Sequence, residues 1–477
     1  MLLTVGRLGV NMKVLVDNQI RIKKPNQDLK DWCGKNLVVE NPEYVKKCRM
    51  NLWTGKTPKQ LRLYEKDGED LILPYGCLDT VIENMDRRDS IELTMPQPKM
   101  VWYGTDVPLY DYQQEAVAEA LAAQYGILQA PAGSGKTQMG IAMAVRLGRR
   151  ALWLTHTHDL LEQSKERAEQ YMSEDLIGTI TDGKVDIGKG ITFATVQTMC
   201  KLDLAQYKHH WDVIIVDECH RVAGTPTAMT QFSKVLNSLG ARHKYGLSAT
   251  VHRADGLIVA TYALLGRVVW QVPEEAVAER IMKVNIWPRP TGVVMSRECL
   301  DTDGTIIYAK MVSWLASEPD RNDLIICDLY ANQDHSNLIL SDRLAHLKYL
   351  IDHLPDDIKD KAVMISGKMT SKKEKEARAQ ALEDMRTGKK RYLFATYALA
   401  KEGLDIPRLD RLYLTSPQKD YAVVAQSIGR IARTAKGKGE PICFDYVDSK
   451  IPYLLRSYKK RCTTYRKLGC RIFTEEE

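Results

Sequence analysis

The segment 130–137 reads Ala-Pro-Ala-Gly-Ser-Gly-Lys-Thr and combines residue types that bind phosphate groups. A glycine-rich turn between a strand and a helix, here with Gly133 and Gly135, exposes backbone N–H groups and a helix N-terminus to a phosphate. Lys136 would contact the β- and γ-phosphates, and the Thr137 hydroxyl would bind Mg²⁺. The segment departs from the usual pattern only in having Ala130 at the first glycine. It therefore predicts a nucleoside-triphosphate site with Mg²⁺.

Two acidic residues, Asp217 and Glu218, come directly after the apolar run 211–216. Ligands of parallel α/β sheets bind at the carboxyl ends of strands, so this pair is expected at the same edge as the phosphate loop. Asp217 would hold Mg²⁺ through its water shell, and Glu218 would orient and deprotonate the attacking water. Taken alone, such a pair is equally compatible with solvated surface. Its place after a phosphate loop favours triphosphate hydrolysis.

Short apolar runs alternate with helical patterns from Tyr125 onward, which is typical of a parallel α/β sheet. A second series of such runs comes after a break. We therefore expect an α/β fold with two doubly wound parallel-sheet domains in tandem. The predicted strands are Gly126–Ala130, Ala151–Thr155, Ile191–Thr195, Trp211–Asp217 and Tyr245–Ser248, then Asn337–Ser341, Ala362–Ser366, Arg391–Thr396, Arg411–Ser416 and Ile442–Val447.

The stretch between the two series, Gln271–Ile325, contains Pro273, Pro288 and Pro290 and then a turn-like Asp-Thr-Asp-Gly segment. This composition favours a linker and a hairpin over core strands. The first 105 residues or so have neither the period nor the motifs of the later part of the chain, and indicate a small accessory domain. The predicted domains are residues 1–105, 106–285 and 286–477.

Composition sets the class of protein. The chain has 477 residues and a formal charge of +7, and its ten cysteines show no C-x-x-C pair. We expect reduced thiols, with no zinc and no disulfide framework. No apolar run approaches the roughly 20 residues that cross a bilayer, so we expect no membrane partner and a cytoplasmic location, in a bacterium or an infected host cell.

The ordered motifs from about Leu109 to Arg433 resemble those of superfamily-2 helicases. The resemblance implies that both tandem domains are RecA-like. It also implies ATP as the nucleotide, with Gln113 as the base contact, although the arginine that relatives often carry near position 110 is absent. The residues that couple hydrolysis to domain movement would be His220, Ser248 and Thr250.

The same resemblance assigns residues of the second domain to the nucleotide site. The segment 426–433 is similar to the family's Q-x-x-G-R-x-x-R helix, which makes Gln426 catalytic and Arg430 and Arg433 finger residues. A basic solvated helix face is the alternative. In a fifth motif, Gly403 would permit close backbone approach and Asp405 would meet the ribose, or both would form an ordinary turn.

Nucleic-acid contacts are also implied by the resemblance. Short hydroxyl and amide side chains suit sequence-independent contact with phosphates. Each threonine taken alone favours a structural role, and only the order of the residues along the chain supports the contact. Arg253 belongs to a segment similar to the R-x-D element of XPB-like repair helicases and UvsW-like phage helicases, with a loop salt bridge as the alternative. The predicted contacts are Thr155, Thr195, Gln197, Arg253, Ser341, Arg343 and Thr396.

Two segments leave alternatives open. The basic segment Lys450–Arg471 either contacts phosphates and bases or packs as a helix on the second domain. Residues 1–105 grip duplex DNA, dock a partner protein or brace the motor. We predict an ATP-dependent DNA helicase or translocase acting on single-stranded, forked or branched DNA in replication, recombination or repair, with a phage or mobile element as a candidate source. The 3′ to 5′ polarity is implied by the resemblance. The alternatives are a branch-migration or annealing motor, an RNA helicase, and an ATP-binding adaptor.

Overall fold

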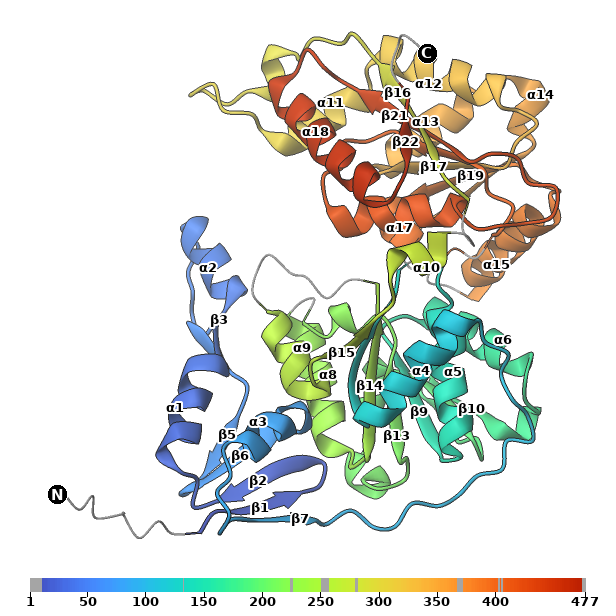
Figure 1. The fold of residues 1–477 in the computed structure, drawn as a ribbon. Coiled ribbons are helices and arrows are strands. Elements are labelled where there is room, and N and C mark those ends of the chain that lie inside the picture. The colour runs from blue at the N-terminus through green and yellow to red at the C-terminus, as the bar shows by residue number, and fades with distance from the viewer. Residues whose placement is uncertain are drawn as a thin grey trace. The chain divides into compact units, whose positions relative to one another are not determined.

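The structure is a computed structural model that describes residues 11–131, 133–223, 226–249, 257–278, 282–366, 372–401, 404 and 406–473. Four of the predicted site residues, Thr250, Arg253, Gly403 and Asp405, lie outside these residues. The chain divides into two compact units, Met1–Pro273 and Glu274–Glu477 (Figure 1). The division falls earlier than the predicted start of the last domain at residue 286.

The first unit contains an eight-stranded sheet in the order β11-β10-β12-β9-β13-β14-β8-β15. All its strand pairs are parallel except β10 with β11. The strands are β8 (Tyr125–Gln129), β9 (Ala151–Thr155), β10 (Ile177–Thr181), β11 (Lys184–Asp186), β12 (Ile191–Thr195), β13 (Val213–Val216), β14 (His243–Ser248) and β15 (Val268–Gln271). The helices are α4 (Asp111–Ala123), α5 (Lys136–Leu147), α6 (His158–Glu169), α7 (Val196–Met199), α8 (Pro226–Ser238) and α9 (Ile258–Leu265).

The central strands of this sheet are continuous apolar runs because helices cover both of their faces. Every residue of β9 and β13 is buried. Trp153 of β9 is fully buried, and a Cβ atom on Gly140 of α5 would lie 2.7 Å from its ring. Only glycine therefore lets α5 pack this closely on the sheet, which fixes the helix that begins at the phosphate loop.

The second unit has a seven-stranded sheet in the order β18-β19-β17-β20-β21-β16-β22, with parallel pairing throughout its described strands. The predicted α/β fold with two parallel-sheet domains is confirmed. The strands are β16 (Asn285–Pro290), β17 (Asn337–Ser341), β18 (Ala362–Ile365), β19 (Tyr392–Thr396), β20 (Arg411–Leu414), β21 (Ile442–Val447) and β22 (Arg471–Ile472). The helices are α10 (Glu274–Ala278), α11 (Tyr308–Leu315), α12 (Pro319–Ala331), α13 (Leu344–Asp352), α14 (Asp356–Lys359), α15 (Lys372–Thr387), α16 (Tyr397–Lys401), α17 (Tyr421–Ile431) and α18 (Pro452–Lys467).

The prediction that Gln271–Ile325 holds no core strand was wrong, because β16 pairs along its whole length with β21. The N–H groups of Asn285 and Thr291 donate to carbonyls on the β21 side, whereas the Ile286 carbonyl accepts from Phe473 on the other side. Residues alternate in direction along a strand, so Pro288 and Pro290 turn toward the β22 side. Their missing N–H groups cost the β16–β21 ladder nothing.

The accessory domain is built on a five-stranded sheet in the order β5-β6-β2-β1-β7. Its core includes Tyr125 and Ala263 of the neighbouring domain, and Tyr75 Oη donates to the Arg242 carbonyl at 3.0 Å. The two domains therefore share one core within the first unit. Its elements are β1 (Lys13–Val16), β2 (Gln19–Lys23), α1 (Gln27–Asn36), β3 (Val38–Glu40), α2 (Pro42–Arg49), β4 (Gln60–Arg62), β5 (Glu65–Asp67), β6 (Asp70–Pro74), α3 (Leu78–Glu83) and β7 (Ser90–Leu93).

A lysine is enclosed where these two domains meet. Lys244 is fully buried, and its Nζ donates to the carbonyls of Asn18 at 3.1 Å and Leu236 at 2.8 Å. The ammonium also lies 4.9 Å from the ring centroid of Tyr75. Burial disfavours the charged form and lowers the pKa of Lys244 to about 7.

Among the described residues, no helix is both long and apolar enough to cross a membrane. All ten cysteines are free thiols.

Candidate functional site

The phosphate loop connects β8 to α5 at the carboxyl edge of the first sheet. Gly133 and Gly135 have φ angles of 84° and 80°. In this left-handed region, residues other than glycine are strained. A Cβ atom on Gly135 would lie 2.5 Å from Gln113 Nε2. Lys136 begins the helix, and its Nζ donates to the Ala130 carbonyl at 3.4 Å. The structure thus forms the predicted strand, turn and helix with the lysine folded over the turn.

Gln113, at the start of α4, holds this loop in place. The side chain is buried, its Nε2 donates to the Ser134 carbonyl at 2.7 Å, and its Oε1 accepts from the Tyr110 N–H at 2.9 Å. Tyr112 Oη donates to the same Ser134 carbonyl at 2.9 Å, a contact that we did not predict. The Gln113 amide therefore positions the phosphate loop, and its contact with a base stays a prediction.

The acidic pair lies directly after β13, at the same sheet edge. Asp217 is buried, with its Oδ1 accepting from the Glu218 N–H at 2.9 Å and its Oδ2 from Ser164 Oγ at 3.4 Å. Burial raises the pKa of Asp217 to about 7, and the Glu218 carboxylate adds to this rise while the Lys136 ammonium opposes it. Ser164 on α6 is a further residue that sequence reasoning missed.

Mg²⁺ fits the donor set at this edge. Magnesium prefers oxygen ligands from one or two carboxylates, with water and phosphate completing its coordination. The Asp217 carboxylate and the Thr137 hydroxyl supply protein oxygens of this kind. Two neighbouring carboxylates, one of them buried, also favour a nearby cation because its charge would stabilise both ionised groups.

A chain of polar contacts leads from the acidic pair to the next strand. Glu218 adopts a left-handed conformation with φ of 47°, which is strained for a residue with a side chain. Its Oε2 lies 3.2 Å from His220 Nδ1, and the same nitrogen lies 3.0 Å from Ser248 Oγ at the end of β14. Of the predicted coupling residues, His220 therefore contacts both Glu218 and Ser248.

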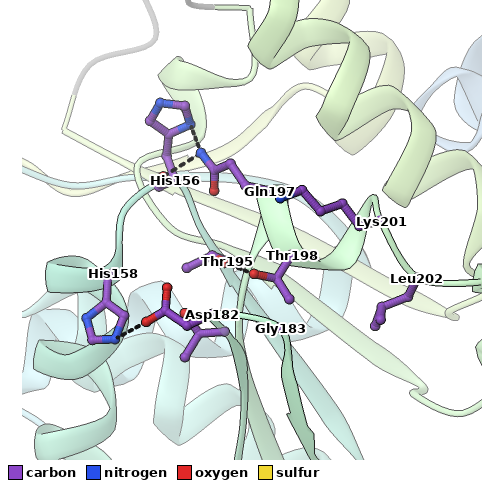
Figure 2. A pocket seen from close by; sticks show the side chains of 10 residues that line it. His156, His158, Asp182, Gly183, Thr195, Gln197, Thr198, Lys201 and Leu202 are labelled. Atoms are coloured by element: carbon purple, nitrogen blue, oxygen red, sulfur yellow. Dashed lines mark hydrogen bonds and ion pairs between the residues drawn. The ribbon is translucent and has the colours of Figure 1, made fainter. Parts of the chain in front are cut away.

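A polar pocket opens at the carboxyl ends of β9, β10 and β12 (Figure 2). It has a volume of about 540 Å³. Gln197 Nε2 donates to the His156 carbonyl at 2.8 Å, and Thr195 Oγ1 donates to Thr198 Oγ1 at 3.0 Å. The residues that line it are His156, His158, Thr181, Asp182, Gly183, Thr195, Gln197, Thr198, Lys201 and Leu202.

Of the three contacts predicted in the first unit's described residues, Thr195 and Gln197 line this pocket and Thr155 does not. Thr155 is fully buried, and its hydroxyl donates to the Thr157 carbonyl at 3.0 Å. In this structure the Thr155 side chain braces the turn into α6. Lys201 was not predicted, although a lysine shortly after the Thr195–Thr198 segment is a suitable signal for phosphate contact.

Helix α17 of the second unit carries Gln426 and Arg430, and Arg433 lies just beyond its end. Arg430 Nη1 donates to the Leu404 carbonyl at 3.1 Å. The buried Gln426 Oε1 has no hydrogen-bond partner. An unpaired buried acceptor is costly, and such groups in native proteins call for a functional or structural explanation.

Lys438 ties down the chain at the end of this helix. Its Nζ donates to the carbonyls of Ile431 at 2.7 Å and Arg433 at 2.6 Å, and to that of Pro407 at 3.1 Å. Cations are favourable at helix C-termini because the last carbonyls there lack partners. Lys438 therefore fixes the backbone that carries Arg433, a role that we did not predict.

The remaining predicted contacts lie at the ends of neighbouring strands, where Ser341 of β17 is paired in register with Thr396 of β19. Ser341 is fully buried, with its Oγ 3.0 Å from His346 Nδ1 and 2.8 Å from Ser416 Oγ. Thr396 is half-buried and Arg343 is exposed. The Ser341 hydroxyl thus supports the sheet edge, whereas Arg343 presents a cation to solvent.

The basic C-terminal segment forms helix α18, and two of its key residues face inward. Arg461 donates to both oxygens of Asp445, at 2.9 and 2.7 Å, and Tyr465 Oη donates to Asp445 Oδ2 at 2.7 Å. All three residues are buried. For Arg461 and Tyr465 the structure therefore supports the packed-helix alternative over contact with bases.

Comparison with known proteins finds helicase families and relatives named as helicases. The family described as "Type III restriction enzyme, res subunit" matches residues 106–253, and the "Helicase conserved C-terminal domain" family matches residues 321–435. "Probable helicase D10" of Escherichia phage T5 is 24% identical over 468 residues, which cover 97% of this chain and 96% of the relative. "DNA 3'-5' helicase XPB" of Mycobacterium tuberculosis is 24% identical over 221 residues, which cover 44% of this chain and 37% of the relative.

A solved structure supports the fold. S. cerevisiae Dbp5 bound to RNA and ADP BeF3 aligns with a TM-score of 0.55 and 16% identity, over 76% of this chain and 90% of that one. Two tandem parallel-sheet domains, a phosphate loop and an acidic pair at one sheet edge define an ATP-driven nucleic-acid helicase. The chain belongs to the superfamily-2 helicases.

Proposed function

We propose that the chain is an ATP-dependent DNA helicase or translocase that moves 3′ to 5′ along one strand. The observation that carries the proposal is the contact chain from Glu218 through His220 to Ser248. It links the carboxylate assigned to water activation with the end of the adjacent strand β14. Hydrolysis at the acidic pair can therefore move the segment that comes after Ser248.

Each residue at the nucleotide has a separate chemical task. The phosphate loop binds the phosphates through backbone N–H groups and Lys136, with Gly133 and Gly135 allowing the approach. Thr137 and Asp217 would hold Mg²⁺, which neutralises charge on the phosphates when bound. Glu218 accepts the proton of the attacking water.

Residues of the second unit are also assigned to the nucleotide, as cations and as a contact with the ribose. Arg430 and Arg433 are assigned to the charge that develops on the transferred phosphoryl group, a contribution that is worth roughly 10³–10⁵-fold in related enzymes. Gln426, whose buried Oε1 lacks a partner, is assigned to the same group. Gly403 and Asp405 keep their proposed roles at the nucleotide.

The nucleic-acid strand is assigned to the pocket of Figure 2 and to the carboxyl edge of the second sheet. Gln197, Lys201 and backbone N–H groups suit contact with phosphate oxygens, which gives a grip that does not depend on base sequence. Thr155, Thr195, Ser341, Arg343 and Thr396, together with Arg253, remain proposed members of this track. The buried hydroxyls would act by positioning the backbone.

The names of the relatives support DNA as the substrate, the 3′ to 5′ direction of movement and the proposed biological process. XPB of Mycobacterium tuberculosis is named a DNA 3'-5' helicase, and the relative from phage T5 spans nearly the whole chain. We therefore place the protein in replication, recombination or repair of DNA, in the cytoplasm of a bacterium or an infected cell. A branch-migration or annealing motor would use the same site with a duplex substrate.

RNA is the second candidate because of one specific relative. "Putative ATP-dependent RNA helicase L396" of Acanthamoeba polyphaga mimivirus is 24% identical over 458 residues, which cover 91% of this chain and 83% of the relative. Contacts to phosphates alone do not distinguish the two sugars.

The test is the rate of ATP hydrolysis with single-stranded DNA, duplex DNA, a DNA fork or RNA of matched length. Single-stranded or forked DNA is expected to stimulate hydrolysis most, and Lys136→Ala is expected to abolish it in every case. Stimulation by RNA alone would assign the track to RNA. Stimulation by duplex but not by single strands would favour the branch-migration motor.

A further inference from the structure

The accessory domain carries a basic segment between strands β3 and β4, residues 41–59, which we call the basic arm (Figure 1). β3 and β4 pair as a two-stranded antiparallel base. The arm consists of helix α2 and then a loop, and α2 has no buried residue. A helix with no fully buried residue adds little to the stability of its own domain, so its exposed surface is available for another molecule.

The arm combines positive charge with exposed apolar side chains. Glu43 is its only acidic residue, whereas five residues are basic: Lys46, Lys47, Arg49, Lys56 and Lys59. Trp53 is 89% exposed, and its neighbour Leu52 is 54% exposed. Large apolar side chains gathered on one exposed segment mark interaction surfaces, and the charge favours an anionic partner.

The loop that carries Trp53 is held by specific contacts. Asn41 caps α2 by accepting from the Glu43 N–H at 3.0 Å, and its Nδ2 donates to the Pro58 carbonyl at 2.9 Å. Lys47 Nζ donates to Thr57 Oγ1 at 2.6 Å. A Cβ atom on Gly55 would lie 3.0 Å from the Trp53 ring, so the glycine leaves room for the indole. The indole is thus presented to solvent on a braced loop.

We propose that the basic arm binds nucleic acid, with Trp53 stacked on a base at a fork or duplex end and Lys56 and Lys59 against phosphates. An exposed aromatic ring among cations is the combination that binds unpaired bases without reading their sequence, because every base has a stacking face. The inference rests on the proposed function in that it assumes the motor's track to be nucleic acid.

The base of the arm connects this contact to the motor. Val39 and Leu61 pack against a buried cluster that includes Ala223, Leu257 and Ala260. Ala223 lies shortly after the Asp217–His220 segment in the chain, and Leu257 precedes α9. The base of the arm is therefore in contact with elements that flank the coupling residues.

The experiment compares Trp53→Ala with Trp102→Ala in the full-length chain. Both tryptophans are 89% exposed, so neither truncation removes core packing, and only Trp53 lies in the basic arm. Binding of a dye-labelled DNA fork is measured by fluorescence anisotropy without nucleotide. Trp53→Ala is expected to weaken fork binding roughly 5- to 150-fold, the range for loss of one stacked base, and Trp102→Ala to leave it unchanged.

A charge variant tests the phosphate contacts. Lys56→Glu/Lys59→Glu is expected to reduce the slope of log affinity against log salt concentration by about 2. Lys30→Glu/Lys35→Glu on α1 is the matched control, because these lysines are exposed on the same domain outside the arm. Equal slopes in the two double variants would overturn the assignment of Lys56 and Lys59.

Wild-type fork affinity in Trp53→Ala overturns the proposal, as does Trp53-dependent self-association in sedimentation, which would assign the arm to a second copy. ATP hydrolysis at saturating single-stranded DNA is measured in parallel, and is expected to be unchanged by Trp53→Ala. If nucleic acid fails to stimulate wild-type hydrolysis while fork affinity still depends on Trp53, the proposed function fails and the assignment of the arm stands.

Discussion

Removal of the His220 side chain should separate ATP hydrolysis from strand displacement. His220 Nδ1 lies 3.2 Å from Glu218 Oε2 and 3.0 Å from Ser248 Oγ, so one imidazole nitrogen faces both groups. His220→Ala removes the contact with the Glu218 carboxylate as well as the hydrogen bond with Ser248, together worth about 1.5–3 kcal/mol, whereas Ser248→Ala removes the hydrogen bond alone, worth about 0.5–1.5 kcal/mol. If these bonds act in the transition state, the hydrolysis rate falls roughly 10- to 150-fold in the first variant and roughly 2- to 10-fold in the second.

The assay is a double-mutant cycle on two rates, strand-stimulated ATP hydrolysis and displacement of a labelled strand. Because His220 contacts both partners, Ser248→Ala should change the hydrolysis rate little once His220 is already alanine. We expect an interaction free energy of at least about 0.5 kcal/mol between the two sites. Strand displacement should fall by a larger factor than hydrolysis in both single variants. Additive effects on both rates would refute the contact chain as the coupling element.

Three further predictions concern residues away from this chain. Gly135→Ala should raise the KM for ATP and lower stability by about 1–2 kcal/mol, because it adds left-handed strain and a Cβ atom 2.5 Å from Gln113 Nε2. Gly68→Ala is the control: it adds the same strain with open space around it, and should leave the KM unchanged. Lys438→Met should lower kcat and leave the KM for ATP nearly unchanged, because it releases the carbonyl of Arg433, and Lys438→Arg should recover part of the loss. Burial lowers the pKa of Lys244 from 10.5 to about 7, so the unfolded state binds more protons than the folded state between these pH values. The free energy of unfolding of the wild type should therefore rise with pH over this range, by on the order of a few kcal/mol. Lys244→Met should flatten this pH dependence. Denaturant unfolding at pH 7 and pH 9.5 measures this, and equal slopes for wild type and variant would count against a buried Lys244.

The strands that could be predicted from sequence are those buried on both faces. β9, β12, β17 and β21 occupy the predicted residues, because a continuous apolar run bounded by polar residues has one favourable place in a parallel sheet. β16 was missed because its two prolines mark a strand end in most contexts. They are tolerated only through their direction in the sheet, which depends on pairing with a strand far along the chain.

The site shows the same division between local and distant signals. The phosphate loop and the acidic pair are each contiguous in sequence, so residue type and order were enough to predict them. The contact of Ser164 with Asp217 joins residues far apart in the chain, and a single serine on a helix carries no signal for it. Likewise, the burial of the Thr155 and Ser341 hydroxyls results from packing of neighbouring strands, which a motif cannot report.

The proposed role of Glu218 is to drive a nucleic-acid motor by activating water at the edge of the first sheet. Its most direct test is the single-turnover rate of ATP hydrolysis in Glu218→Gln, measured with single-stranded DNA and alongside the affinity for ATP. Loss of a general base predicts a rate lowered roughly 10²- to 10⁴-fold, with ATP affinity retained and no stimulation by the strand. A variant that hydrolyses ATP near the wild-type rate, or that is still stimulated by DNA, would contradict this role of Glu218.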